Sequence, residues 1–591
     1  MAGKIIPETF RLIKDSSLRC TLINSLIMIF RSVFPLLVIF LLKKLVDMLV
    51  DPAAATPFSS QSLVLFVVVI ALILLADDLL AIAGRYYARV QSGQLEGHML
   101  GLIHSHASKL GLASFEDATF HELLGRAAGD AIWRPAAIVS DLILTLRGAI
   151  SFIAMAVILS RLSILLVFVV ILAFIPAFIS KLAGSERLYK IRPQKAKLSR
   201  KWEYFSWLIT AERPAREVKL FGLGSYFDEL FRKHFKEARD LELKTIRRGG
   251  WFDAGAALFK ALFFAGIVIY LSFSMVSRKI SAGEMAMYLV AFRQAMVYLR
   301  DMISGMTGID EDRLFLRDFF EFLDRKEDVF AREPVKDLPE KEGDIEISDL
   351  TFCYPGSTTP ALKDINLRIG RGEKVAIVGA NGSGKSTLVK MLCRLYDPDS
   401  GEIRYSGVPI VHFSPDAYRK CFSVVFQDFM LYYLSVRENI GLSDLTVHPS
   451  DEKLRAIFRR AGLDLFSDDL PLGFDTALGH IDSGGRELSW GEWQKIAIVR
   501  ALFRQAPVLI LDEPSSSLDA TSEYEIFSHL DDITSGRTTV LISHRLSNVI
   551  NADRIIVMSR GVIAETGTHQ ELIEKGGVYS EMYTSQKNLY R

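Results

Sequence analysis

The chain has 591 residues, of which 50% are hydrophobic, and a formal net charge of +1 at pH 7. This length allows more than one domain, and so large an apolar fraction is unusual for a soluble protein. The balanced charge gives no global reason to expect nucleic-acid binding. Four cysteines match no zinc or disulfide spacing and favour a reducing compartment, and the N-terminus lacks a signal-peptide pattern.

Six long apolar segments precede residue 310, and each is near or above the ~20 residues that a helix needs to cross a bilayer. They cover about 20–50, 62–84, 136–160, 163–183, 254–277 and 284–307. Buried helices of a soluble protein are the alternative, but such helices are shorter and more amphipathic. Residues 1–310 are therefore expected to form an all-α membrane domain with six helices.

Lysine and arginine are unevenly distributed among the connections between these segments. The stretches 85–135 and 181–253 are long and rich in both residues, whereas 51–62 contains neither. Positive charge marks the cytoplasmic side, so we expect both long connections and both termini there. Apolar residues near their far turns, within 111–127 and 212–227, favour short helices that dock on another domain over solvated hairpins.

Several charged residues lie inside the apolar segments, where a charge is costly unless it faces a partner or a wet cavity. Those that we expect to line a cavity are Arg31, Asp77, Asp78, Arg147, Lys260 and Arg293. The alternative for any one of them is that the membrane-spanning part of its helix has other bounds than those given above, which would leave the charge in the cytoplasm. As a set, they predict a polar cavity in the membrane domain.

A charged linker over 311–344 precedes a soluble domain, 345–591, in which short apolar runs alternate with helical stretches as in a parallel α/β sheet. GANGSGKST (379–387) follows an apolar run, precedes a helical stretch and has the spacing of a phosphate-binding loop. Its glycines let backbone N–H groups surround phosphate, Lys385 adds positive charge, and the Ser386 hydroxyl suits Mg²⁺. The expected nucleotide contacts here are Gly379, Asn381, Gly382, Ser383, Gly384, Lys385, Ser386 and Thr387.

Two further apolar runs end in polar residues. PVLILDEP (507–514) reads as a strand covered on both faces and ends with Asp512, placed for Mg²⁺, and Glu513, placed to polarise an attacking water. TTVLISH (538–544) ends with His544, at the strand end where open α/β sheets bind ligands. A lone histidine is more often structural, but the order of the motifs favours a catalytic role.

The stretch LSWGEWQK (488–495) begins a helix, because Ser489 followed three residues later by Glu492 forms a capping box. A helix N-terminus also offers free N–H groups to an anion, and Gly491 allows close approach. Trp490 contributes its backbone N–H, while its side chain must turn away. The stretch is therefore an ordinary helix start and a candidate phosphate contact.

The motifs occur in the order phosphate loop, FQD, LSWGE, LDEP, SSLD and ISHR, which resembles the nucleotide-binding domain of an ATP-binding cassette (ABC) transporter. Nearly the whole chain is similar to bacterial half-size exporters, in which six membrane helices precede one P-loop NTPase domain. The resemblance implies ATP and Mg²⁺ as cofactors. It also implies that Tyr354 stacks on adenine and that Gln427 reaches the metal and the attacking water. Glu513 would be the base and His544 the γ-phosphate contact.

The same resemblance implies a homodimer, because Ser489 and Gly491 would close on the ATP of a partner chain and Asp519 would communicate between cassettes. The segments 111–127 and 212–227 match the family's coupling helices. The signature departs from the usual LSGGQ, with Trp490 for the first Gly and Glu492 for Gln. Glu492 preserves the capping box, whereas the bulk of Trp490 puts the geometry of dimer closure in doubt.

The implied function is ATP-driven export of an amphipathic substrate across a bacterial cytoplasmic (inner) membrane, with the bilayer and the substrate as partners and no nucleic acid. GGRELSWGEWQKIAIVRAL resembles exporters of bacterial peptides, and a lipid flippase or multidrug exporter fits the charged cavity as well. An ATP-gated channel or regulator and an importer are the other classes. Intact catalytic residues argue against the first, and the fused chain with long inner connections argues against the second.

Overall fold

The computed structural model describes residues 2–50, 60–325, 337–339, 343–463, 468–480, 485–514, 523, 528–529 and 533–589. The chain divides into two compact units. The first comprises Met1–Ser108 and Glu122–Arg325, and the second comprises Lys109–His121 and Lys326–Arg591.

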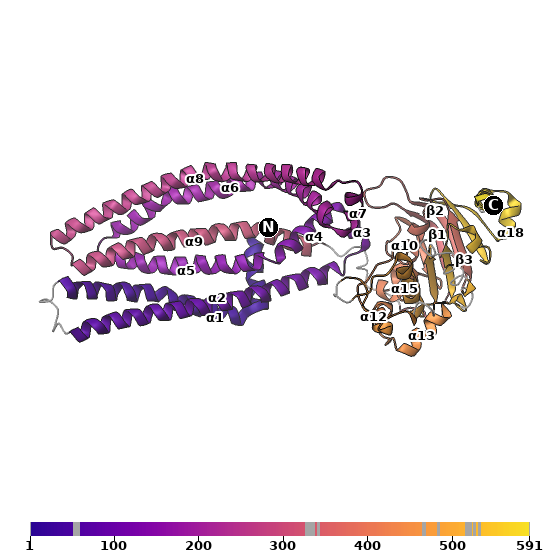
Figure 1. The fold of residues 1–591 in the computed structure, drawn as a ribbon, viewed down its shortest axis with the longest axis horizontal. Helices are drawn as coiled ribbons and strands as arrows, with labels where there is room; N and C mark the ends of the chain where they lie inside the picture. The colour runs from indigo at the N-terminus through magenta and orange to yellow at the C-terminus, as the bar shows by residue number, and fades with distance from the viewer. Residues whose placement is uncertain are drawn as a thin grey trace. The chain divides into compact units, whose positions relative to one another are not determined.

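The first unit is built of helices, most of them long (Figure 1). They are α1 (Ala2–Val50), α2 (Ser60–Ala107), α4 (Ala118–Ala131), α5 (Arg134–Ser160), α6 (Ile164–Thr210), α7 (Glu212–Leu220), α8 (Gly224–Val276) and α9 (Ala282–Leu323). α5 lies along α9, α1 along α2, and α6 along α8, and α1 also packs on α9 and α5. The α6–α8 pair therefore forms one two-helix arm, and the other long helices form a bundle.

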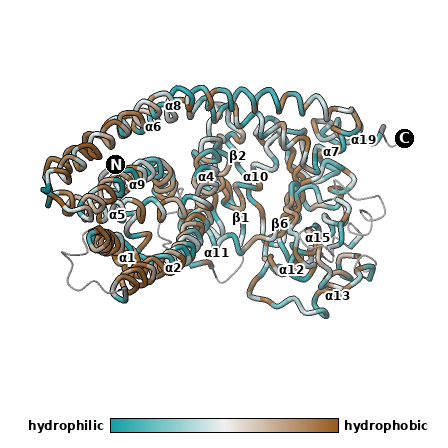
Figure 2. Tube along the Cα trace, turned by 60° about the vertical axis from the view of Figure 1, so that its left-hand side comes forward, coloured by the Kyte–Doolittle hydropathy of each residue, from teal (hydrophilic) through white to brown (hydrophobic). Residues whose placement is uncertain are grey.

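Five helical segments among the described residues are long and apolar enough to cross a membrane. They are Arg11–Val50, Leu63–Ala107, Arg134–Ser160, Ile164–Gly184 and Gly224–Val276. Figure 2 shows apolar residues concentrated along one part of the long helices and polar residues along the rest of α6 and α8. Five of the six predicted apolar segments are thereby confirmed as helices of this kind.

The sixth predicted segment, 284–307, lies in α9 and is less apolar, because Glu284, Arg293, Arg300 and Asp301 interrupt it. Most of its apolar residues are buried or partly buried, with Phe292 fully buried and Met306 exposed. That α9 crosses the membrane stays a prediction.

Close contacts and ion pairs stabilise the bundle. A Cβ at Gly148 of α5 would lie 2.6 Å from the backbone nitrogen of Met302, so this glycine allows α5 and α9 to approach closely. Lys43 of α1 pairs with Glu284 of α9 at 2.8 Å. α1 also bends at Ser17, where the backbone leaves helical geometry.

The helix boundaries differ from the predicted ones in three places. α9 continues to Leu323, so the beginning of the predicted linker, 311–344, is helical. The predicted short helix in 111–127 is instead α3 (Leu112–Glu116) followed by α4, because Asp117 accepts a hydrogen bond from the Thr119 N–H and starts a new helix. In 212–227, α7 ends before Gly222, which adopts a φ of +63°, and α8 then begins.

The second unit contains two sheets. Their strands are β1 (Ile345–Phe352), β2 (Leu362–Ile369), β3 (Lys374–Gly379), β4 (Ser400–Tyr405), β5 (Val408–Pro409), β6 (Phe422–Val425), β7 (Val508–Asp512), β8 (Thr538–Ile542), β9 (Arg554–Ser559) and β10 (Val562–Gly567). The smaller sheet is antiparallel, with the order β2-β1-β4-β5. The larger has the order β10-β9-β3-β8-β7-β6 and is parallel except at β10.

Helices cover the larger sheet, as the predicted α/β pattern requires. They are α10 (Lys385–Leu392), α11 (Pro415–Arg419), α12 (Val436–Gly441), α13 (Asp451–Arg460), α15 (Trp490–Phe503), α18 (His569–Lys575) and α19 (Val578–Leu589), with 3₁₀ turns at Ile410–His412, Gly473–Asp475 and Leu546–Asn548. Every residue of β7 and β8 is buried, as the unbroken apolar runs predicted. The polar residues that follow these strands therefore meet at one edge of the sheet.

Candidate nucleotide-binding site

The loop between β3 and α10 has the backbone of a phosphate-binding loop. Gly384 adopts a φ of +103°, which residues with a side chain rarely adopt. A Cβ at Gly379 would lie 2.2 Å from the carbonyl oxygen of Met558, so the neighbouring strand requires glycine there. Lys385 Nζ donates hydrogen bonds to the carbonyls of Gly379 and Ala380, at 2.9 and 3.0 Å, inside the loop.

Electrostatics at this loop follow from burial. The Lys385 side chain is buried, and burial lowers its pKa, while the nearby Glu513 and Asp512 carboxylates raise it. The ammonium therefore lies in a place with little water and two negative neighbours. Such a cation is strongly attractive to phosphate oxygens.

Asp512, at the end of β7, meets Ser386, at the start of α10, through a side-chain hydrogen bond. Burial raises the pKa of Asp512 to about 6. Its Oδ1 is buried and finds no hydrogen-bond partner among the described residues. A hydroxyl beside a carboxylate oxygen without a partner is a suitable donor set for Mg²⁺, which prefers oxygen ligands.

Glu513 follows β7 with a φ of +51°, and its N–H donates to the carbonyl of Ile542 on β8 at 3.0 Å. One carboxylate oxygen lies 2.5 Å from His544 Nε2, and the other accepts from Gln427 Nε2 at 3.1 Å. A positive φ is uncommon outside glycine and is typical of strained functional positions. The structure thus brings together the three predicted catalytic side chains, with Glu513 in the middle.

Gln494 is a contact that the sequence reasoning missed. This buried side chain of α15 donates to the backbone carbonyl of Glu513 at 3.3 Å. It therefore ties the helix that Ser489 begins to the strand end that carries the predicted base. Its place in EWQK (492–495) predicts only the interior of the helix, so the sequence gives no local pattern that indicates this contact.

The capping box predicted at Ser489 is present. The Ser489 hydroxyl accepts from the Glu492 N–H at 3.3 Å, and the Glu492 carboxylate accepts from the Ser489 N–H at 2.7 Å. Glu492 is also held by Arg486 at 3.1 Å. Ser489 itself is exposed, so the N-terminus of α15 is accessible to a ligand.

Trp490 occupies the first position of α15, and its side chain is turned onto Phe429. The two ring centroids are 5.1 Å apart with the planes tilted by 34°. Trp490 is 48% exposed, whereas Phe429 is buried. The expectation that the indole turns away from the helix start therefore agrees with this packing, and the backbone N–H of Trp490 stays available.

Tyr354, predicted to stack on adenine, belongs to an aromatic group with Phe352 and Tyr396. Its hydroxyl lies 3.0 Å from Thr387 Oγ1, which links it to the phosphate loop helix. Lys390, one turn further along α10, has its ammonium 5.2 Å from the centre of the Tyr354 ring. The ring is therefore held in place from two sides.

The segment Lys109–His121 belongs to this unit and contacts α10. Glu116 of α3 pairs with Lys390 at 3.2 Å, and Leu112 and Ala113 pack against the apolar core beneath the smaller sheet. Phe120 is fully buried. These contacts lie within the second unit, and the docking role expected for 111–127 stays a prediction. At the other turn, Leu220 is exposed.

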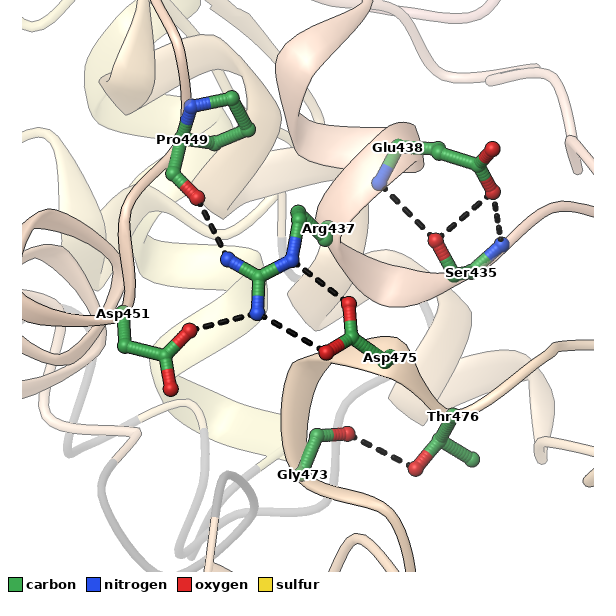
Figure 3. A network of polar contacts seen from close by, with 8 residues as sticks. All are labelled: Ser435, Arg437, Glu438, Pro449, Asp451, Gly473, Asp475 and Thr476. Carbon is green, nitrogen blue, oxygen red and sulfur yellow. Dashed lines mark hydrogen bonds and ion pairs between the residues drawn. The ribbon is translucent and has the colours of Figure 1, made fainter.

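Figure 3 shows a polar cluster centred on Arg437, which joins α12 to the start of α13 and to the 3₁₀ turn Gly473–Asp475. Arg437 of α12 donates two hydrogen bonds to Asp475, at 2.6 and 3.1 Å, one to Asp451 at 2.5 Å, and one to the carbonyl of Pro449 at 2.7 Å. The bond with Asp475, followed by that with Asp451, raises the pKa of Arg437. Arg500 of α15 donates to Asn439 of the same helix α12 at 2.7 Å.

The other predicted nucleotide contacts differ in how exposed they are. Asn381 and Gly382 are exposed at the tip of the loop, and Ser383 is buried with no partner for its hydroxyl among the described residues. Gly491 is partly buried. Asp519 lies outside the described residues.

The six charges predicted to line a membrane cavity separate into different places. Arg31 pairs with Asp77 at 3.0 Å between α1 and α2, and Arg147 of α5 lies within electrostatic reach of both. Lys260 lies elsewhere and lines a hollow of about 470 Å³ between α6, α8 and α9. Asp78 and Arg293 are exposed. The structure thus brings three of the residues together and does not unite the whole set in one cavity.

The lining of the hollow at Lys260 carries charges of both signs. Its lining has three basic side chains, Lys181, Lys260 and Arg300, and two acidic ones, Asp253 and Glu311. Asp253 accepts from Ser180 at 2.8 Å, and Lys181 donates to Ser304 at 2.9 Å. Lys181 lies near the end of its apolar segment, where a basic residue is ordinarily read as a membrane flank.

Comparison with known proteins agrees with this geometry. A family model described as ABC transporter matches residues 362–516. The nisin transport ATP-binding protein NisT of Lactococcus lactis subsp. lactis is 31% identical over 481 residues, which are 81% of this chain and 80% of that protein. The subtilin transport ATP-binding protein SpaT of Bacillus subtilis is 30% identical over 484 residues, 81% of this chain and 78% of that one.

Two further comparisons extend to other exporters. The ATP-dependent lipid A-core flippase of Alkalilimnicola ehrlichii is 37% identical over 382 residues, 64% of this chain and 63% of the flippase. The solved structure of a bacterial Atm1-family ABC exporter with ATP bound superposes with a TM-score of 0.77 at 24% identity, covering 96% of this chain and 98% of that one. That likeness confirms the predicted fold class, a helical membrane domain followed by an α/β ATPase domain. The chain belongs to the ABC transporter family and is a multi-pass exporter that couples ATP hydrolysis to transport.

Proposed function

We propose that two copies of this chain form an exporter of an amphipathic peptide in a bacterial cytoplasmic membrane, with both termini and the ATPase domain on the cytoplasmic side. The observation that carries the ATPase assignment is the convergence of Gln427, Glu513 and His544 beside Lys385. One chain contributes one such site and one exposed helix start at Ser489. A sandwich of two copies would complete each site.

The role of each residue in the nucleotide site follows from its charge and from the groups that it contacts. The phosphate loop and Lys385 bind the phosphates of ATP, and the helix start at Ser489 of the second copy closes on the γ-phosphate. Glu513 accepts the proton of the attacking water, and Gln427 and His544 orient it. Both side chains contact the Glu513 carboxylate, so the base has a fixed position in the site.

Ser386, Asp512 and Gln427 would hold Mg²⁺, which would neutralise charge on the transferring phosphate. The partnerless Asp512 oxygen beside Ser386 supports this assignment. Tyr354 would stack on adenine, and Asp519 would lie at the contact between cassettes.

The substrate assignment rests on the relatives and on the charge of the membrane unit. The nisin and subtilin transport proteins favour a peptide, and the lipid A-core flippases favour a lipid as the second candidate. Mixed charge in the membrane unit, both at Arg31, Asp77 and Arg147 and at the Lys260 hollow, suits an amphipathic molecule of either kind.

The test of the ATPase and dimer proposals is Glu513→Gln in the full chain. Removal of the base should lower phosphate release at least 100-fold while ATP binding persists, because general-base catalysis contributes about 10²–10⁴-fold. Light scattering with ATP and Mg²⁺ should then find trapped dimers. Glu492→Gln is the matched control, since it makes the same change at the capping box and should leave turnover within about threefold.

Near-normal phosphate release by Glu513→Gln would contradict the assigned base, and a monomer with full turnover would contradict the shared site. The substrate is tested in proteoliposomes of wild-type protein. ATP-dependent movement of a labelled amphipathic peptide, with no movement of a labelled lipid, is expected. Movement of the lipid alone would favour the flippase alternative.

A further inference from the structure

A basic groove of about 680 Å³ lies between α6 and α8 in the first unit. Five of its lining residues are basic, and no acidic residue is found among them in the described part of the chain. The basic residues are Arg187, Lys190, Lys244, Arg247 and Arg248. The proposed transport cycle uses none of them.

The groove lies where both helices leave their apolar parts. The membrane-spanning segment of α6 ends at Gly184, three residues before Arg187. On α8, which runs alongside in the opposite direction, Arg247 and Arg248 precede the apolar segment predicted at 254–277. The basic side chains of both helices therefore lie together at the cytoplasmic boundary predicted from the positive charge of these connections.

Aromatic residues at the same level indicate the headgroup region of a bilayer. Trp251 lines the groove and is 79% exposed, and Phe252 is 62% exposed. The Arg187 guanidinium lies 5.3 Å from the centre of the Phe252 ring. Tryptophan is enriched at membrane interfaces, where one part of the ring is apolar and the other is hydrated.

Acidic residues flank the groove on both helices, and three of them have partners in the structure. Glu186 pairs with Lys190 at 2.7 Å, Glu242 pairs with Lys195 at 3.0 Å, and Asp253 accepts a hydrogen bond from Ser180 at 2.8 Å. Of these three, Glu186 is paired with a groove residue, and it also acts electrostatically on Arg187. Five basic side chains in the lining outnumber this carboxylate, so the groove keeps an excess of positive charge.

We propose that this groove binds the phosphodiester headgroup of an anionic phospholipid of the cytoplasmic leaflet, with Trp251 at the boundary of the acyl chains. Clustered lysines and arginines attract phosphate, and arginine forms paired hydrogen bonds with its oxygens. A basic groove next to an exposed tryptophan fits a lipid better than a soluble phosphate. The lipid headgroup would pair with the basic side chains, and its acyl chains would contact the indole ring.

The test is native mass spectrometry of the full chain in detergent, titrated with dioleoyl phosphatidylglycerol and with zwitterionic phosphatidylcholine. Wild type should bind the anionic lipid preferentially. The double substitution Arg247→Gln/Arg248→Gln should weaken that binding about 30-fold, at about fivefold for each charge. The matched control is Lys233→Gln/Lys236→Gln, which removes the same charge from exposed positions of α8 that do not line the groove and should leave binding unchanged.

Three results would overturn the proposal. Equal effects of both double substitutions would mean nonspecific attraction. Displacement of the lipid by soluble glycerol phosphate would mean a site for free phosphate. A shift from dimer to monomer in the Arg247/Arg248 variant with unchanged lipid binding would mean that the groove faces a second copy.

A second measurement applies if the double variant does not fold. Brominated phosphatidylglycerol should quench tryptophan fluorescence of wild type in nanodiscs, and Trp251→Phe, which keeps every charge, should lose that part of the quenching. Unchanged quenching in this variant would also overturn the proposal.

Discussion

Trp490 is the clearest departure from the family's signature, and its removal tests how that helix start works. Trp490→Gly restores the glycine of the usual motif and keeps the backbone N–H at the first position of α15. The indole contacts Phe429, at 5.1 Å between ring centres. If the N–H is the part that meets phosphate, loss of the ring should cost stability more than catalysis.

The size of both effects can be worked out from the packing. An aromatic pair contributes about 0.5–1.5 kcal/mol beyond burial, and glycine in a helix costs up to about 1 kcal/mol relative to good helix formers. The side chain is 48% exposed, so its burial term is roughly half that of a core tryptophan. We expect a loss of about 2 kcal/mol in stability, or a fall of about 4–8 °C in Tm. We expect ATPase activity to stay within about tenfold, which is ~1.4 kcal/mol in the barrier.

The assay is ATPase turnover of the full chain in nanodiscs at saturating ATP, together with a thermal melt of the same sample. Trp490→Phe is the control, because it keeps a ring against Phe429 and should lose less Tm than the glycine variant. Complete loss of turnover by Trp490→Gly, with the fold intact, would refute the reasoning. The indole would then have a direct part in closing the site.

Three further predictions concern the surroundings of the site. Arg437→Lys cannot reproduce the forked hydrogen bonds to Asp475 and Asp451, so the melting temperature should fall by about 3–6 °C, and an unchanged Tm would show that the cluster contributes nothing. Glu116→Gln removes the 3.2 Å pair with Lys390, and hydrogen exchange of 109–121 should rise by up to about fivefold while β1 is unaffected. Burial raises the pKa of Asp512 to about 6, so protons compete with Mg²⁺ for this carboxylate increasingly as the pH falls below that value. The Mg²⁺ concentration for half-maximal ATPase should therefore rise more steeply below pH 6 in wild type than in Asp512→Asn, and equal slopes would contradict this.

Local patterns predicted most of the fold. Apolar runs longer than a bilayer crossing gave five of the long helices, and unbroken apolar runs gave the buried strands β7 and β8. The boundaries at 111–127 and 311–344 were less accurate. A single capping contact at Asp117 divides one helix into two, and α9 continues to Leu323 although its last part is charged. Such details depend on individual side chains rather than on periodicity.

The site was predictable where chemistry requires particular residues in a fixed local order. Lys385, Asp512 and Glu513 belong to short motifs at strand ends, so the topology alone brings them together. Gln494 was missed because its contact with the Glu513 carbonyl spans two elements and leaves no local pattern. The surroundings of the charged residues in the membrane helices were less predictable still. Which neighbours Arg31 or Lys260 faces depends on how each helix is rotated and packed.

The contacts of α3 suggest how closure at the nucleotide could reach the membrane helices. Lys390 lies five residues after Lys385 on the same helix, a rise of about 7.5 Å, and it contacts Glu116 and the Tyr354 ring. A shift of α10 on binding phosphate or adenine would therefore move the partner of Glu116 directly. A partly exposed ion pair contributes only up to about 1 kcal/mol, whereas coupling between sites typically requires about 1–3 kcal/mol. The ion pair alone is at the lower limit, so the apolar packing of Leu112 and Ala113 against the core must provide much of the coupling.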